Sequence, residues 1–215
     1  MIQLEQVTKI YRTVNGPLRV LDNVTTVIPT DRNVGILGRN GTGKSTLLRL
    51  IARAEAPTRG RIRANCRLSW PMGFSGGFQG SLSAIENIRF VSRIHGVDWR
   101  QTVKFVEEYT ELGNFMRMPV STYSSGMRAR LNVAMSLAIR FDTYLIDEIP
   151  GVGDARFRKR FDDSFKMIKK ESSLILVSHD PGSIKKHCDV VMMVSKGKLH
   201  LYENIEEALK VYENE

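Results

Sequence analysis

The sequence has little of what marks secreted, membrane-spanning or disulfide-stabilised proteins. It has two cysteines, Cys66 and Cys188, which are far apart and lack the spacing of a metal site, so we expect free thiols. No apolar run approaches the roughly 18 residues that a membrane-spanning helix needs. The first residues lack the basic and apolar segments of a signal peptide. We therefore expect a cytoplasmic globular protein.

Composition and charge narrow the partners without deciding among them. Hydrophobic residues make up 42% and charged residues 26%, and 215 residues fit one domain with room for an inserted lobe. The formal net charge is +9, and residues 1–70 hold 12 lysines and arginines against four acidic residues. Such a surface suits nucleic acid, an anionic bilayer or a polyanionic substrate, and it is also common as a solvated face beside a nucleotide site.

A glycine-rich segment at residues 38–46 fits the pattern G-x-x-x-x-G-K-[ST] of a phosphate-binding P-loop. It consists of Gly38, Arg39, Asn40, Gly41, Thr42, Gly43, Lys44, Ser45 and Thr46. The apolar run 34–37 before it predicts a buried strand, and the segment 47–51 after it predicts a helix. The three glycines are expected to take positive φ, so that backbone N–H groups and the helix N-terminus meet phosphate. Lys44 can reach the β- and γ-phosphates, and Ser45 can hold Mg²⁺.

The segments on either side of this loop predict a sheet and a helical region. Residues 2–29 read as several short strands of an antiparallel sheet, and Arg61 to Ser69 as one or two strands. Tyr11 either stacks on adenine or is a half-buried strand tyrosine. Residues 83–118 are expected to be helical, beginning with a Ser83–Glu86 capping box. Val103, Val106, Tyr109 and Leu112 share one expected helix face.

Polar residues mark the ends of several later elements. Ser124, Ser125 and Gly126 precede a helix predicted over 128–140, where they serve either as an N-cap or as a second anion site. The apolar run 144–146 ends at Asp147, placed to hold Mg²⁺, and Glu148, placed to polarise a water. Strand 174–177 ends near His179, a γ-phosphate candidate. We also expect a helix at 157–170, strands at 190–194 and 198–202, and a helix at 205–212.

The order of these motifs resembles that of the ATP-binding cassette ATPases along essentially the whole chain. Residues 123–127 are similar to a degenerate form of the family's Leu-Ser-Gly-Gly-Gln signature. Tyr11 matches the family's adenine-stacking aromatic, Asp154 its D-loop aspartate and His179 its switch histidine. The resemblance implies one α/β domain over 1–215, with a RecA-like P-loop NTPase core, an antiparallel β subdomain and a helical subdomain near 83–138.

Three segments more closely resemble the ATPase subunits of capsular polysaccharide exporters of Gram-negative bacteria: residues 69–82, 122–131 and 152–157. Exporters of lipid-linked O-antigen and of teichoic acid share part of this pattern and remain an alternative. Many O-antigen ATPases carry an added carbohydrate-binding domain, for which 215 residues leave no room. A cassette protein acting on nucleic acid and a P-loop kinase are weaker alternatives.

The resemblance implies a mechanism and a set of partners. Two copies would face each other head to tail, with Ser124 and Gly126 of one copy completing the ATP and Mg²⁺ site of the other. A membrane permease would dock near residues 70–95, with periplasmic and outer-membrane export partners beyond it and no nucleic acid. The chain would lie peripherally at the cytoplasmic face of the inner membrane, as an ATPase.

Two positions depart from the family's pattern. The spacing of the Q-loop glutamine, counted from Glu86 and Asn87, falls on Phe74, whereas the glutamine nearby is Gln79. Either Gln79 contacts the nucleotide and Mg²⁺, or another group does this work. The usual Ser-Ala-Leu-Asp of the D-loop is Gly-Val-Gly-Asp at residues 151–154.

Overall fold

The computed structural model describes residues 1–72, 78–148 and 155–214, and the chain divides into two compact units. The first unit comprises Met1–Pro71, Phe141–Ile149 and Lys169–Glu215. The second comprises Met72–Arg140 and Pro150–Ile168. Each unit has its own secondary structure, and each is described by itself.

The first unit begins with an antiparallel sheet of strand order β2-β1-β4. Its strands are β1 (Ile2–Thr13), β2 (Gly16–Ile28) and β4 (Arg59–Ala64). The predicted antiparallel sheet is confirmed, although β1 and β2 are long strands rather than several short ones. On the edge strand β4, Arg61 and Arg63 both pair with Glu5 of β1, so part of the basic excess is neutralised within the sheet.

A second sheet of the first unit has strand order β5-β6-β3-β7-β8. Four of its strands are parallel, and β8 pairs with β7 antiparallel at the edge. Its strands are β3 (Val34–Leu37), β5 (Thr143–Asp147), β6 (Ser173–Val177), β7 (Val190–Ser195) and β8 (Lys198–Tyr202). Strand β3 is buried throughout, as its unbroken apolar sequence predicts for a strand covered on both faces. The α/β class is confirmed.

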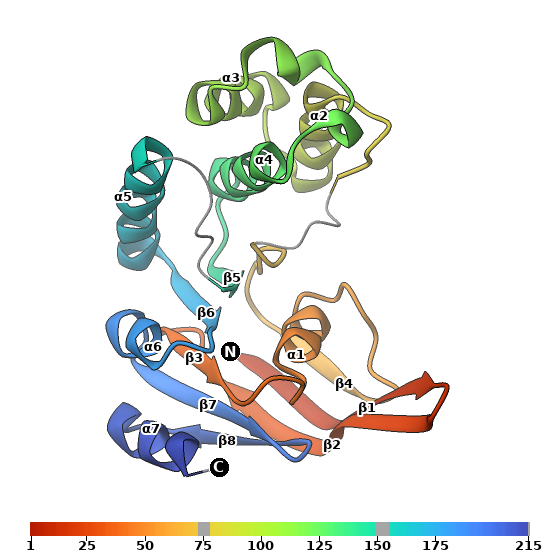
Figure 1. Cartoon of the computed structure of the whole chain (residues 1–215), viewed down its shortest axis with the longest axis vertical. Coiled ribbons are helices and arrows are strands. Elements are labelled where there is room, and N and C mark those ends of the chain that lie inside the picture. Colours follow the sequence, from red (N-terminus) through yellow and green to blue (C-terminus); the bar gives the residue numbers. More distant parts are fainter. Residues whose placement is uncertain (73–77, 149–154, 215) are drawn as a thin grey trace. The chain divides into compact units, whose positions relative to one another are not determined.

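Three helices belong to the first unit: α1 (Lys44–Ile51), α6 (Pro181–His187) and α7 (Ile205–Glu213). Buried side chains of α1, including Leu47, Leu48 and Ile51, join those of both sheets in one hydrophobic core. Helix α7 lies beside β7 and β8 (Figure 1). The sequence interpretation missed α6, a seven-residue helix whose Asp180 caps the N–H groups of Gly182 and Ser183.

The second unit is helical. Its helices are α2 (Ala84–His95), α3 (Trp99–Thr110), η1 (Gly113–Arg117), η2 (Val120–Thr122) and α4 (Ser125–Ala138), and α5 (Ala155–Glu171) extends beyond it. Helix α3 packs against α2 and α4 (Figure 1). Tyr109 of α3 contacts α5, where its hydroxyl lies 3.2 Å from Ser164 Oγ and its ring meets Phe157 edge-on.

Most predicted helix boundaries of this unit hold. The Ser83–Glu86 capping box is confirmed, with Ser83 N–H donating to Glu86 Oε2 at 2.8 Å and Glu86 N–H donating to Ser83 Oγ at 3.2 Å. The prediction that Leu112 shares the helix face of α3 is wrong. Glu111 takes a left-handed conformation with φ of 55° and ends the helix before Leu112.

Candidate functional site

The P-loop lies between β3 and α1, as the sequence predicts. Gly41 and Gly43 take positive φ, 82° and 103°, and Gly43 caps α1. The prediction of positive φ for Gly38 is wrong, and this glycine is needed for another reason. A Cβ there would lie 2.5 Å from Val194 O and 2.8 Å from Thr42 Oγ1, so any side chain would clash with the next strand.

Lys44 places its ammonium group at the loop itself. Its Nζ donates to Gly38 O at 2.7 Å and to Arg39 O at 3.0 Å. Burial lowers the pKa of Lys44, although the charges of Glu148 and Asp147 oppose this shift. The partly buried ammonium of Lys44 and the N-terminus of α1 both lie at this loop. The loop is therefore suited to bind an anion.

Ser45 of α1 contacts Asp147 at the end of β5. Ser45 Oγ donates to Asp147 Oδ1 at 3.3 Å, although 102 residues separate them in the chain. Burial raises the pKa of Asp147, and the hydrogen bond from Ser45 opposes that shift. A hydroxyl and a carboxylate are the oxygen donors that Mg²⁺ prefers when nucleotide phosphates supply other ligands. The residues present therefore fit Mg²⁺.

Glu148 and His179 form a second pair at the same edge of the sheet. His179 Nδ1 lies 2.7 Å from Glu148 Oε1, and the two side chains are 64% and 58% exposed. Glu148 has φ of 65°, which costs a residue with a side chain about 1–3 kcal/mol, and its N–H donates to Val177 O at 2.9 Å. Strain at an exposed acidic residue is typical of functional positions.

Strand order explains why these groups converge. Strand β6 lies between β3 and β5 in the sheet, although it follows both in the sequence. The P-loop, Asp147 and His179 thus lie at or just after the carboxyl ends of three parallel strands, β3, β5 and β6, and open α/β sheets bind ligands at such ends. His179 also lines a cavity of about 520 Å³ with Arg39, Asn40 and Tyr212. Tyr212 was not a predicted site residue, because no motif connects the last helix to this edge.

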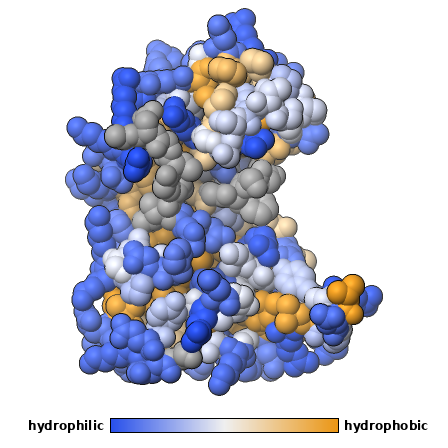
Figure 2. All heavy atoms as spheres, viewed as in Figure 1, coloured by the Kyte–Doolittle hydropathy of each residue, from blue (hydrophilic) through white to orange (hydrophobic). Residues whose placement is uncertain are grey.

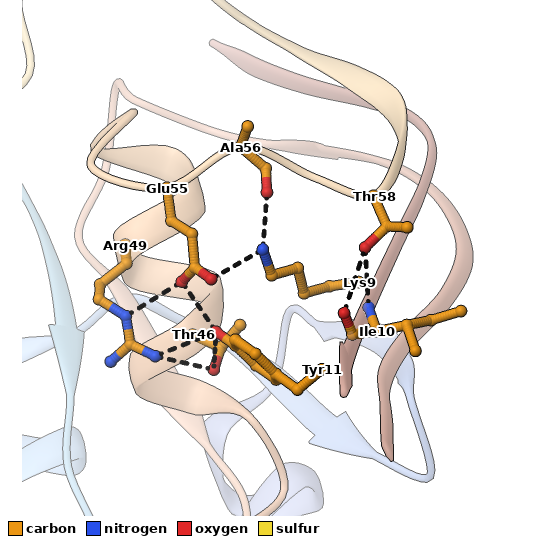
Figure 3. A network of polar contacts seen from close by, with 8 residues as sticks. All are labelled: Lys9, Ile10, Tyr11, Thr46, Arg49, Glu55, Ala56 and Thr58. Carbon is orange, nitrogen blue, oxygen red and sulfur yellow. Dashed lines mark hydrogen bonds and ion pairs between the residues drawn. The ribbon is translucent and has the colours of Figure 1, made fainter. Parts of the chain in front are cut away.

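Tyr11 lies on β1, and its hydroxyl is held by polar groups of α1 and of the loop after it (Figure 3). The sequence interpretation missed Lys9, Arg49 and Glu55, the charged partners around this hydroxyl. No sequence signal links Tyr11 to Glu55, since 44 residues separate them.

The remaining predicted residues lie in the second unit or outside the described residues. Ser124 is the N-cap of α4, with Met127 N–H donating to its Oγ at 3.2 Å, and Gly126 follows in the first turn. Gln79 N–H donates to Asn87 Oδ1 at 2.8 Å, and its side-chain Nε2 donates to Ser81 Oγ. Two predicted positions lie outside the described residues: the Q-loop position Phe74 and the D-loop residues 151–154.

Comparison with known proteins points to one family. A family model described as ABC transporter matches residues 21–150. The polysialic acid transport ATP-binding protein KpsT of Escherichia coli is 45% identical, and the alignment covers all of both chains. The capsule polysaccharide export ATP-binding protein CtrD of Neisseria meningitidis is also 45% identical, over 99% of this chain and 98% of the relative.

Less similar proteins also match this chain. A teichoic acids export ATP-binding protein of Staphylococcus haemolyticus is 34% identical, over 93% of this chain and 76% of the relative. Among solved structures, a dimeric ATP-binding cassette in a post-hydrolysis state, with ADP and phosphate bound, superposes with a TM-score of 0.76 at 20% identity. That alignment covers 95% of this chain and 99% of the other. The chain therefore belongs to the ABC transporter family, as one of its ATP-binding subunits.

Proposed function

We propose that this chain is the ATP-hydrolysing subunit of an exporter that moves a capsular polysaccharide across the inner membrane. The observation that carries the proposal is full-length identity of 45% to ATP-binding proteins of polysialic acid and capsule export. The teichoic acid relative is 34% identical, so export of teichoic acid or of lipid-linked O-antigen is the weaker alternative.

In this proposal the first unit binds the nucleotide. The backbone N–H groups of residues 38–46 and the ammonium of Lys44 hold the β- and γ-phosphates, and the Tyr11 ring stacks on adenine. Ser45 and Asp147 hold Mg²⁺. Bound Mg²⁺ supplies charge neutralisation at the phosphates. The 3.3 Å contact between Ser45 and Asp147 supports this assignment.

Glu148 is the proposed general base. Its exposed carboxylate can take a proton from a water that attacks the γ-phosphate, and such help is worth about 10²–10⁴-fold in rate. His179, 2.7 Å from that carboxylate, orients Glu148 and contacts the γ-phosphate. The strained backbone at Glu148 supports a role in which the direction of the carboxylate matters.

A second copy of the chain completes the site. The N-terminus of α4, with Ser124 as its cap and Gly126 in its first turn, would meet the γ-phosphate bound by the partner copy. The cassette structure that superposes on this chain is a dimer, which supports the arrangement. Asp154 would contribute the cross-dimer contact of the D-loop.

The chain is proposed to lie peripherally at the cytoplasmic face of the inner membrane, bound to a permease, with periplasmic and outer-membrane partners and without nucleic acid. Among residues 1–72, 78–148 and 155–214, no helix is both long and apolar enough to cross a membrane. On α2, Phe90 and Ile94 are 62% and 63% exposed, which supports permease docking near residues 70–95. Figure 2 shows a largely hydrophilic face with hydrophobic side chains at several separate places.

The test is made in the cell. Lys44→Ala removes the ammonium from the P-loop, and Lys104→Ala removes an exposed lysine of α3 as a matched control. We expect Lys44→Ala to leave the cell surface bare and polysaccharide trapped inside, while Lys104→Ala behaves as wild type. Chemical analysis of the trapped glycan then identifies the substrate. An unchanged surface, with ATPase activity lost in the purified Lys44→Ala protein, would mean that the cassette has another cargo.

A further inference from the structure

Glu55 is the centre of a polar cluster that joins three parts of the first unit (Figure 3). It lies in the loop between α1 and β4 and accepts three hydrogen bonds. The donors are Lys9 Nζ at 2.7 Å, the Tyr11 hydroxyl at 2.8 Å and Arg49 Nε at 3.3 Å. Burial raises the pKa of Glu55, but the hydrogen bonds from these donors outweigh it, so the pKa falls below its usual value and Glu55 stays ionised.

The hydroxyl of Tyr11 is fixed from a second side by the P-loop helix. Arg49 Nη2 donates to the Tyr11 oxygen at 3.3 Å, and Thr46 Oγ1 lies 3.4 Å from it. Arg49 Nη2 also donates to Thr46 Oγ1 at 3.1 Å. The phenol oxygen therefore contacts both Glu55 and the first two turns of α1. In the first of these turns, Thr46 lies two residues after Lys44.

The ring of Tyr11 is also constrained. The Lys9 ammonium lies 5.0 Å from its centroid, over one face, and Lys9 is itself held by Glu55 and by Ala56 O at 2.8 Å. Adenine stacking on this ring would therefore have to use the opposite face. A ring that is already fixed loses less conformational freedom when a ligand binds, so fixing it strengthens binding without a new contact to the ligand.

We propose that Glu55 is a positioning residue that orients the Tyr11 ring for the nucleobase, acting through the Tyr11 hydroxyl and through Lys9. This inference rests on the proposed stacking of Tyr11 on adenine. The inference goes beyond that stacking, because it assigns part of the affinity for the nucleobase to a carboxylate that does not touch the nucleotide. It also predicts that the hydroxyl of Tyr11, and not its ring alone, contributes to ATP binding.

A purely structural role predicts something different. If the cluster only ties the loop after α1 to β1, loss of Glu55 lowers the melting temperature and leaves ATP affinity unchanged. If the cluster supports the P-loop rather than Tyr11, loss of Glu55 weakens every phosphate ligand alike. Inorganic tripolyphosphate, which has phosphates but no base, separates these cases.

The experiment is a double-mutant cycle on the full chain. Glu55→Ala and Tyr11→Phe each break the same carboxylate–hydroxyl contact, and the double variant breaks it once. We expect each single change to raise the KM for ATP by about three- to tenfold. We expect kcat within twofold and unchanged inhibition by tripolyphosphate. The double variant should be no worse than the more affected single, because the two side chains act as a unit.

Control variants distinguish the possible negative results. Glu5→Ala removes a carboxylate with two arginine partners from the same sheet and should leave the KM unchanged. If Glu55→Ala does not fold, Glu55→Gln and Tyr11→Phe carry the test. An unchanged KM in Tyr11→Ala would overturn the stacking of Tyr11. A raised KM in Tyr11→Ala with normal values in Tyr11→Phe and Glu55→Ala, or strictly additive effects, would overturn the role of Glu55 alone.

Discussion

Replacing Glu148 with glutamine removes one negative charge and a proton acceptor while keeping the size of the side chain. The structure indicates that little else changes. Glu148 is 58% exposed, and a glutamine oxygen can keep the 2.7 Å contact with His179. The backbone N–H of residue 148 keeps its bond to Val177 O. Exposed substitutions of this kind usually change the free energy of unfolding by less than about 0.5 kcal/mol.

The effect on catalysis should be far larger. If Glu148 is the general base, its loss costs about 10²–10⁴-fold in turnover, which corresponds to about 3–5 kcal/mol in the activation free energy. ATP affinity should change little, because Lys44, Ser45 and Asp147 remain. With ATP bound and hydrolysis slowed, the dimer should accumulate.

Steady-state phosphate release measures turnover, and gel filtration with Mg²⁺ and ATP measures the dimer. Glu203→Gln is a matched control, since Glu203 is an exposed carboxylate that pairs with Arg32 instead of His179. The control should keep normal turnover. Turnover of Glu148→Gln within about threefold of wild type would refute Glu148 as the base.

Three further predictions follow from single groups. Burial raises the pKa of Asp147, so its contribution to stability is present at low pH and is lost as the pH rises through the folded-state pKa. Asp147→Asn should therefore raise the melting temperature near neutral pH, by about 2–4 °C for each kcal/mol regained, while Mg²⁺-dependent hydrolysis is lost; no gain near neutral pH, measured by thermal melts across pH, would contradict this. Ser83→Ala should cost about 0.5–2 kcal/mol in urea unfolding, because it removes the acceptor of the α2 capping box, whereas Ser83→Thr should cost less. Burial raises the pKa of Cys188 to about 12, so a thiol reagent at pH 8 should label Cys66 quickly and Cys188 only on unfolding; equal rates in the two single-cysteine variants would count against it.

Local sequence was sufficient for the parts of the fold that local physics controls. The P-loop needs its glycines within a few residues, and Gly41 and Gly43 take the positive φ that their positions predict. The Ser83–Glu86 capping box joins residues three positions apart, and the sequence predicted it equally well. The α/β class was implied by the resemblance to the ATP-binding cassette ATPases, which rests on the order of these local motifs. In contrast, the prediction of positive φ for Gly38 is wrong. The constraint on this glycine comes from Val194 of β7, which is far along the chain.

The sequence by itself determined which residues are candidates for the chemistry, since phosphate, Mg²⁺ and proton transfer each require particular side chains next to particular turns. Tertiary structure alone decided how these residues meet. Insertion of β6 between β3 and β5 places His179 2.7 Å from Glu148 and lets Asp147 reach Ser45. Tertiary structure also decided the surroundings of Tyr11, because its partner Glu55 lies 44 residues away in the chain. Strand order and cross-strand contacts depend on burial summed over the whole sheet, which no short motif records.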